Sequence, residues 1–178
     1  GGGAQVFLLI LIGKEAGFGD VAAGIGILYM ARGFGSGFGP IVSRRLMANV
    51  GLVPYLLGGV LIISGAFYMA VAVSDWTMVI LVYVFISHAA SGVNWVLSTT
   101  MLQKRSADEW LGRVFGPDSL GITMTMGLST VAAGLILENG IMTLRETIIA
   151  TGALQIMAGL LWILLATPEE KKMLDQAI

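Results

Sequence analysis

The stretch GLVPYLLGGVLIISGAFYMAVAV, residues 51–73, decides the fold class of this chain. It runs for 23 residues without a charged side chain. At about 1.5 Å per residue, a helix of that length crosses the roughly 30 Å of hydrocarbon in a bilayer. Its apolar residues form a continuous run instead of one stripe, so every face of the helix favours lipid over water. The stretch therefore predicts a transmembrane helix.

Comparable apolar segments lie on both sides of this stretch, separated by short charged connections. The first apolar run, residues 4–12, is too short to cross a bilayer, and the chain starts at Gly1 without an initiator Met. We expect it to belong to a helix cut through its middle. The sequence thus predicts an all-α polytopic membrane bundle of six segments, the first truncated, at residues 1–17, 21–42, 51–73, 76–99, 118–137 and 147–166.

Composition supports a membrane protein and excludes several other classes. Of the 178 residues, 56% are hydrophobic and 12% are charged, whereas a soluble domain has about 25% charged residues. The net charge of −1, without a basic tract, excludes a nucleic-acid partner. Cysteine is absent, so neither a disulfide framework nor a thiolate metal site is expected. We expect the lipid bilayer as partner and no cofactor.

The distribution of Lys and Arg predicts the orientation. Seven of these residues fall on one side of the six-segment topology and only Lys14 and Arg145 fall on the other. By the positive-inside rule, the side with seven is cytoplasmic. The seven are Arg44, Arg45, Lys104, Arg105, Arg113, Lys171 and Lys172.

Two cytoplasmic segments are expected outside the spans. In residues 102–117, Ser106 and Glu109 have the spacing of a capping box, which predicts a short helix along the membrane surface that ends at Gly112. Residues 167–178 are predicted to be a polar, solvated tail.

Three polar residues on different segments lie at a similar depth. Arg32 is twelve residues after Asp20, His88 is twelve after Trp76, and Gln5 is twelve before Gly17. Twelve residues correspond to about 18 Å of helix, close to the bilayer midplane. Polar groups at that depth are costly toward lipid and should face the bundle interior or water. They are candidate substrate-binding residues.

Segment 76–99 adds a polar face, because Ser91, Asn94 and Trp95 follow His88 at three- and four-residue spacing. These residues complete the candidate substrate site. Two interpretations stay open: Ser and Asn side chains also bond across helices in membranes, and Arg32 could be tied to backbone carbonyls instead of to a substrate.

Glycines and a proline mark segment 21–42. Gly33, Gly35, Gly37 and Gly39 offer small residues four apart, which let two helix backbones approach closely in lipid. A phosphate-binding loop would need a G-x-G-x-x-G turn between a strand and a helix, so helix packing is the better interpretation. Pro40 is a candidate hinge.

Arg113 and Asp118 flank Pro117 where the last connection enters the fifth segment. They could latch the cytoplasmic ends of helices as a gate, or Asp118 could simply complement the positive N-terminus of that helix.

Catalytic and metal-binding patterns are lacking. His88 is the single histidine, and neither G-x-S-x-G nor H-E-x-x-H occurs. No catalytic residue, metal ligand or enzymatic activity is therefore expected.

Several stretches resemble a branch of the major facilitator superfamily. Residues 95–103 (WVLSTTMLQ), 107–109 (ADE) and 112–116 (GRVFG) are similar to the loop between the tenth and eleventh helices of enterobactin-exporter-like and macrolide-efflux-like permeases, the transmembrane secretion effectors. Residues 31–40 (ARGFGSGFGP) resemble their eighth helix.

The resemblance implies the C-terminal six-helix half of a secondary active transporter, built as a 3+3 inverted repeat. Its partners would be a small-molecule substrate and a missing N-terminal six-helix half of the same polypeptide. The implied activity is export of a hydrophobic or amphipathic molecule, of the drug or siderophore class, by alternating access across a plasma membrane of the bacterial inner-membrane type. The alternatives are a six-helix membrane scaffold or assembly protein and a half-size homodimeric permease.

Overall fold

The computed structural model describes residues 2–16 and 18–176, and for residues 50 and 173–176 it describes the backbone only. These residues form helices and connections without a strand. Short 3-10 turns precede α3 and α5, and a π-helix, Trp162–Ala166, joins α6 to α7. The helices are α1 (Gly2–Glu15), α2 (Val21–Leu46), α3 (Val53–Val73), α4 (Val79–Arg105), α5 (Leu111–Glu138), α6 (Leu144–Leu161) and α7 (Thr167–Gln176).

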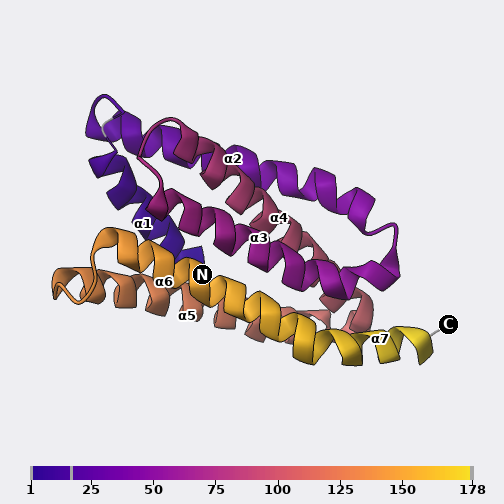
Figure 1. Ribbon diagram of the computed structural model, residues 1–178. Helices are drawn as coiled ribbons and strands as arrows, with labels where there is room; N and C mark the ends of the chain where they lie inside the picture. Colours follow the sequence, from indigo (N-terminus) through magenta and orange to yellow (C-terminus); the bar gives the residue numbers. More distant parts are fainter. Residues whose placement is uncertain (1, 17, 177–178) are drawn as a thin grey trace.

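The helices run roughly along one axis and pack side by side (Figure 1). α4 packs against α2 on one side and α3 on the other, and α3 also packs along α6. α1 contacts α2, α5 and α6, whereas α5 has little contact with α6. Each of the six principal helices thus touches at least two others, and α5 is the least enclosed.

Four helical stretches are long and apolar enough to cross a membrane: Val53–Val73, Val79–Arg105, Asp108–Glu138 and Leu144–Lys172. α2 has 26 residues but is not among them, because its glycines and arginines lower its hydropathy. α1 has 14 residues. The all-α fold is therefore confirmed, and a membrane location suits four of the helices.

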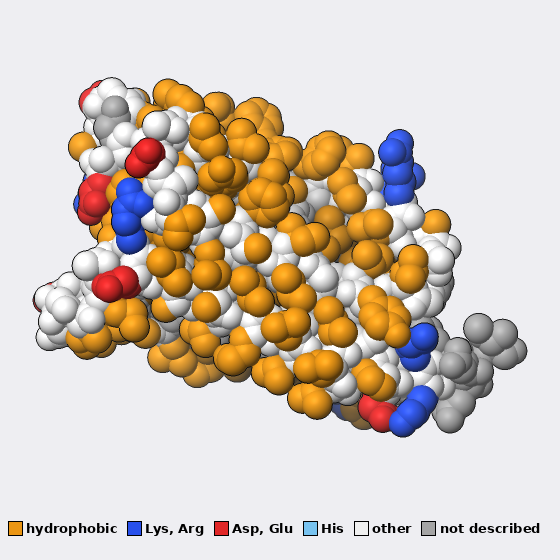
Figure 2. All heavy atoms as spheres, viewed as in Figure 1, with side chains coloured by type: hydrophobic (Ala, Val, Ile, Leu, Met, Phe, Trp, Pro, Cys, Tyr) orange, Lys and Arg blue, Asp and Glu red, His pale blue; other side chains and the backbone are white. Residues whose placement is uncertain are grey.

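Charged side chains gather at the two ends of the bundle. Figure 2 shows hydrophobic side chains over the middle of one face, with Lys, Arg, Asp and Glu toward its ends. At one end, Arg105 of α4 pairs with Glu170 of α7, and Lys171 lies 5.3 Å from the ring centroid of Tyr55 at the start of α3. At the other end, Arg145 donates to the carbonyl of Ser74, at 2.8 Å. The connectivity thus separates the same seven basic residues from Lys14 and Arg145 as the sequence predicted.

Side-chain caps fix the starts of two helices, α2 and α6. Asp20 accepts a hydrogen bond from the backbone of Ala23 at 2.7 Å and starts α2 at the predicted residue. Thr143 and Glu146 form a capping box, so α6 begins three residues before the predicted start of its span.

The predicted surface helix in residues 102–117 is wrong in its boundaries. The hydroxyl of Ser106 donates to the carbonyl of Leu102, at 2.8 Å, instead of forming a capping box. A 3-10 turn, Asp108–Trp110, leads into α5, which passes through Gly112 and begins seven residues before the predicted span. Glycine ends a helix when it adopts a positive φ, and Gly112 does not.

The last span continues into the predicted tail. α6, the π-helix and α7 form one continuous helical segment, so residues 167–176 of the polar tail are helical. Trp162 and Thr167 both donate to the carbonyl of Pro54, at 2.8 and 3.2 Å. These bonds fix the start of α7 against α3. Residues 1 and 17 of the predicted first segment and 177–178 of the predicted tail lie outside the described residues.

Glycines set the closest helix contacts. Along α3 and α6, Gly58 faces Gly159 and Gly65 faces Gly152, with a carbonyl 2.6 Å and 2.5 Å, respectively, from where a Cβ would stand on Gly159 and Gly65. Any larger side chain would force the two backbones apart. α3 and α6 therefore form a tightly packed seam of the bundle.

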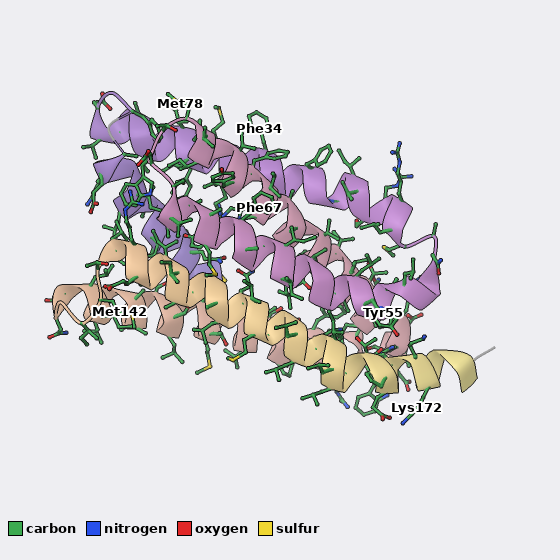
Figure 3. All side chains as sticks on the ribbon, in the orientation of Figure 1. Phe34, Tyr55, Phe67, Met78, Met142 and Lys172 are labelled. Carbon is green, nitrogen blue, oxygen red and sulfur yellow. The ribbon has the colours of Figure 1, made fainter. Side chains whose placement is uncertain are left out.

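The predicted packing glycines of α2 divide into two pairs. Gly35 and Gly39 press against α4, with the carbonyl of Ala89 2.7 Å from a Cβ position on Gly39. Gly33 and Gly37 have nothing within 4 Å of that position among the described residues, so they pack against no described helix, and a packing role for them stays a prediction. Residues two apart on a helix point about 200° apart, so the two pairs face opposite sides. Phe34, between them, points away from the bundle in Figure 3 and is 66% exposed.

Candidate functional site

A cavity of about 800 Å³ lies among the six principal helices. All six residues predicted to bind substrate line it: Gln5 from α1, Arg32 from α2, and His88, Ser91, Asn94 and Trp95 from α4. The depth argument from the sequence is therefore correct about which residues come together. Trp95 is 58% exposed and lies at the rim. Binding of a substrate by these residues stays a prediction.

The cavity lies between two apolar clusters. One cluster, with Ile12, Tyr68 and Ile80, is near the α1–α2 connection. The other, with Val53 and Leu97, is near the opposite end. The polar residues Ser64 of α3 and Ser87 of α4 occur in the chain between the contributions of their helices to these clusters. The bundle therefore has a polar middle layer enclosed by apolar packing.

One side of this layer is a continuous hydrogen-bond network, which we call the closed wall (Gln5, Ser64, Ser87, Ser91 and Gln155). The amide of Gln5 donates to Gln155 at 2.6 Å, and the amide of Gln155 donates to the hydroxyl of Ser64 at 3.0 Å. Ser64 also contacts the hydroxyls of Ser87 and Ser91, at 3.1 and 3.0 Å. The network joins α1, α6, α3 and α4. For Gln5 and Ser91, interhelical bonding is therefore part of their role.

The other side of this layer, which we call the open wall, consists of Arg32, His88 and Asn94. It includes polar atoms without hydrogen-bond partners among the described residues. Nε of Arg32 and Nε2 of His88 are buried and have no hydrogen-bond partner among the described residues. His88 as a whole residue is only 6% exposed to solvent. Unpaired buried polar atoms are rare in native structures because each costs about 1–3 kcal/mol. The open wall therefore carries a desolvation cost at these two nitrogens that no described residue offsets.

Arg32 and His88 lie close together across the contact of α2 and α4. A Cβ on Gly35 would stand 3.2 Å from the Cβ of His88, and Arg32 is one helical turn before Gly35. The guanidinium carbon of Arg32 is 5.7 Å from the ring centroid of Tyr29, whose hydroxyl donates to the carbonyl of Val6 at 3.1 Å. Tyr29 thus holds the arginine from the α1 side.

Pro40 lines the same cavity, one turn after Ser36. Because proline has no N–H, the carbonyl of Ser36 lacks its usual intrahelical donor. That carbonyl lies 2.8 Å from a Cβ position on Gly92. α2 nevertheless runs without interruption through Pro40, and a hinge there stays a prediction.

The predicted gate pair does not form. Among the described residues, the ion pairs are Arg105–Glu170 and Lys172–Glu169, and Arg113 instead stacks 4.8 Å from the ring centroid of Trp110. Arg113 and Asp118 are five residues apart in one helix, so they point about 140° apart. Asp118 is also no helix cap, because α5 begins at Leu111. It lines the cavity instead.

Sequence reasoning missed Gln155, Ser64 and Thr125, of which Gln155 and Thr125 line the cavity. Gln155 is twelve residues after Thr143, the cap of α6. Counting twelve residues from the start of a helix, which identified Arg32 and His88, would also have identified Gln155. The predicted span began at residue 147, so the count from its start did not reach Gln155. Among the described residues, no three His, Cys, Asp or Glu side chains gather as a metal site.

Comparisons with protein-family models, with curated proteins and with solved structures find no match for this chain. The cavity and its chemistry are therefore the basis of the functional argument.

Proposed function

We propose that this chain is the C-terminal six-helix half of a secondary active transporter of the major facilitator type, which exports a hydrophobic or amphipathic small molecule by alternating access. The observation that carries this proposal is the open wall: buried polar groups without partners, from two helices, facing one cavity in the middle of an apolar bundle. Transporter sites near the bilayer midplane need such groups.

The pattern of helix contacts supports an inverted 3+3 repeat. Exchanging α1 with α4, α2 with α5 and α3 with α6 converts the α2–α4 contact into the α5–α1 contact, and α3–α4 into α6–α1; all four contacts exist, whereas α1–α2 and α5–α6 have no counterpart of similar extent among the described residues. On the α3–α6 seam, Gly58–Gly159 and Gly65–Gly152 exchange in the same way, and the two glycines of each helix are seven positions apart. A pseudo-two-fold axis in the membrane plane would produce this pattern.

The exposure of α5 supports a further helical unit. Of its 28 residues, Ala133 alone is buried among the described residues. The N-terminal half that the sequence resemblance implies would cover part of α5 and of the exposed face of α2, and would close the cavity from the other side.

The open wall also bears on the rival functions. A scaffold protein would benefit from the closed wall, since bonds across helices hold a bundle together. It would gain nothing from an arginine and a histidine whose buried nitrogens have no hydrogen-bond partner among the described residues. A half-size homodimeric permease would use the same open wall and would cover α5 with a second copy.

Reconstitution tests the proposal. We expect six further apolar segments in the reading frame upstream of Gly1, and saturable efflux of a lipophilic dye from liposomes that contain the complete protein. Residues 1–178 alone should not transport, because half of the cavity wall is absent. Transport by residues 1–178 together with a cross-linked dimer would identify the homodimer. A complete protein that moves no dye would favour the scaffold.

Orientation has its own test. We expect the seven basic residues and the C-terminus to be cytoplasmic. In intact cells, a cysteine at Arg145 should react with an external impermeant thiol reagent, and a cysteine at Lys172 should be protected. The reverse pattern would contradict this orientation in the plasma membrane.

A further inference from the structure

We propose that the cavity binds an organic anion, with its oxyanion head between Arg32 and His88 and its apolar body along the rest of the cavity. This inference rests on the proposed function for its setting and adds the substrate class. Its geometric basis is the pair of buried, unpartnered nitrogens on two helices that touch at Gly35.

The charge of Arg32 points to an anion instead of a neutral acceptor. No described carboxylate lies within ion-pair distance of its guanidinium, and the side chain is half-buried in an apolar bundle with its Nε fully buried. An uncompensated charge in such a place is costly, so a ligand that brings a negative charge gains both attraction and hydrogen bonds. The Nε–H of Arg32 and an Nε2–H of His88 can both donate to one oxyanion.

The remaining lining suits an apolar body. Leu61 of α3, Ile122 and Met126 of α5 and Val96 of α4 contribute to the cavity along with its polar residues. A volume of about 800 Å³ is in the range of sites for drug-sized molecules. The cavity therefore combines one positive subsite with an apolar wall, which matches an amphipathic anion.

Asp118 is the one carboxylate among the residues that line the cavity. It lies on α5 and forms no ion pair with Arg32 in the described structure. If it supplied the compensating charge, an anion would have to displace it. The substitution Asp118→Asn separates the two cases.

Three probes with one apolar body test the inference: naphthylacetate, naphthylethanol and naphthylethylammonium, which differ in head-group charge. Their binding to the complete protein in dodecyl maltoside is measured by equilibrium dialysis, with empty micelles as the blank. We expect saturable binding of naphthylacetate at least about tenfold tighter than that of naphthylethanol, and weakest binding of the ammonium.

Variants then assign the preference to residues. Arg32→Gln should abolish the preference for the anion, and His88→Gln should reduce it several-fold. Arg44→Gln is the matched control, because Arg44 is an exposed arginine of the same helix and does not line the cavity. Should Arg32→Gln fail to fold, Arg32→Lys keeps the charge but loses the planar fork, and should retain only part of the preference. Asp118→Asn should leave the preference intact.

Equal binding of the three probes, or an anion preference that survives Arg32→Gln, would overturn the inference. So would an anion affinity that rises about tenfold in Asp118→Asn, because that carboxylate would then be the natural partner of Arg32. Efflux of neutral dye without anion preference would sink this inference and leave the transporter standing. Anion preference without efflux would do the opposite.

Discussion

The closed wall and the open wall of the cavity both contain polar side chains at similar depth, but they differ in whether the buried polar atoms of those side chains have hydrogen-bond partners. On the closed wall, Gln155 bonds to both Gln5 and Ser64. On the open wall, Arg32 and His88 keep buried nitrogens without partners. Polar residues in this apolar bundle thus fall into two groups, and hydrogen bonding separates them. The residues of the closed wall hold helices together, and those of the open wall leave hydrogen-bond donors without a partner in the described chain.

The largest effect is expected on the seam that supports the closed wall. In Gly65→Leu, the new Cβ would stand 2.5 Å from the carbonyl oxygen of Gly152 and 3.1 Å from the backbone nitrogen of Ile156, so α3 and α6 must separate. We expect a loss of about 2–3 kcal/mol of stability, or no folded protein. The midpoint of thermal unfolding in detergent measures it. Gly59→Leu, where a Cβ meets nothing within 4 Å, is the control and should change little.

A smaller loss is expected from breaking the closed wall itself. Gln155→Leu removes the bonds to Gln5 and Ser64 and leaves their polar atoms in an apolar bundle. Interhelical hydrogen bonds in membranes contribute up to about 1.7 kcal/mol each, so we expect a loss of about 1–2 kcal/mol. Urea or thermal unfolding in micelles checks it. A stability equal to that of the wild type would mean that the network contributes no net stabilisation and would remove the contrast between the walls.

A gain is expected on α2, the helix that presents Arg32. Gly37→Ala adds a methyl group where nothing lies within 4 Å, and alanine is a better helix former by up to about 1 kcal/mol. Gly39→Ala, two residues on, would meet the carbonyl of Ala89 at 2.7 Å and should destabilise. Opposite signs for the two substitutions, measured by unfolding midpoints, would verify which face of α2 packs on α4.

The smallest effect on stability is expected on the open wall. His88→Ala removes a buried nitrogen without a hydrogen-bond partner, and Asn94→Ala removes a half-buried side chain, so the amount of folded protein in the membrane should stay near that of the wild type. Export by the complete protein should fall about tenfold or more, because the ligand loses its donors. Dye efflux and membrane abundance are measured on the same cells. Loss of abundance before loss of efflux would make these residues structural.

Several features of the fold and site could be predicted from local sequence. Continuous apolar runs identified the helices, since span length depends only on rise per residue and the thickness of the bilayer. Counting twelve residues from a span end brought Gln5, Arg32 and His88 to one level, and the cavity contains all three. The same count failed for Gln155 only because the start of α6 was placed three residues late.

Other features could not be predicted in this way. Ser106 and Glu109 have capping-box spacing, yet the hydroxyl of Ser106 bonds backwards to Leu102. A serine hydroxyl at a helix end can reach the preceding turn as easily as the next, so spacing alone does not decide between them. The end of α4 and the start of α5 were therefore displaced from their predicted positions.

The sequence by itself determined that this chain forms long apolar helices, that its basic residues stand near their ends, and that Gln5, Arg32 and His88 lie at one level along them. These properties depend on the count of residues along one helix. Only the tertiary structure decided that Gly35 and Gly39 pack on α4 while Gly33 and Gly37 do not. It also decided that Arg113 stacks on Trp110, and which polar groups of the cavity have hydrogen-bond partners. Those outcomes depend on how each helix is rotated against its neighbours. That rotation is set by close packing between segments far apart in the chain, which no local pattern records.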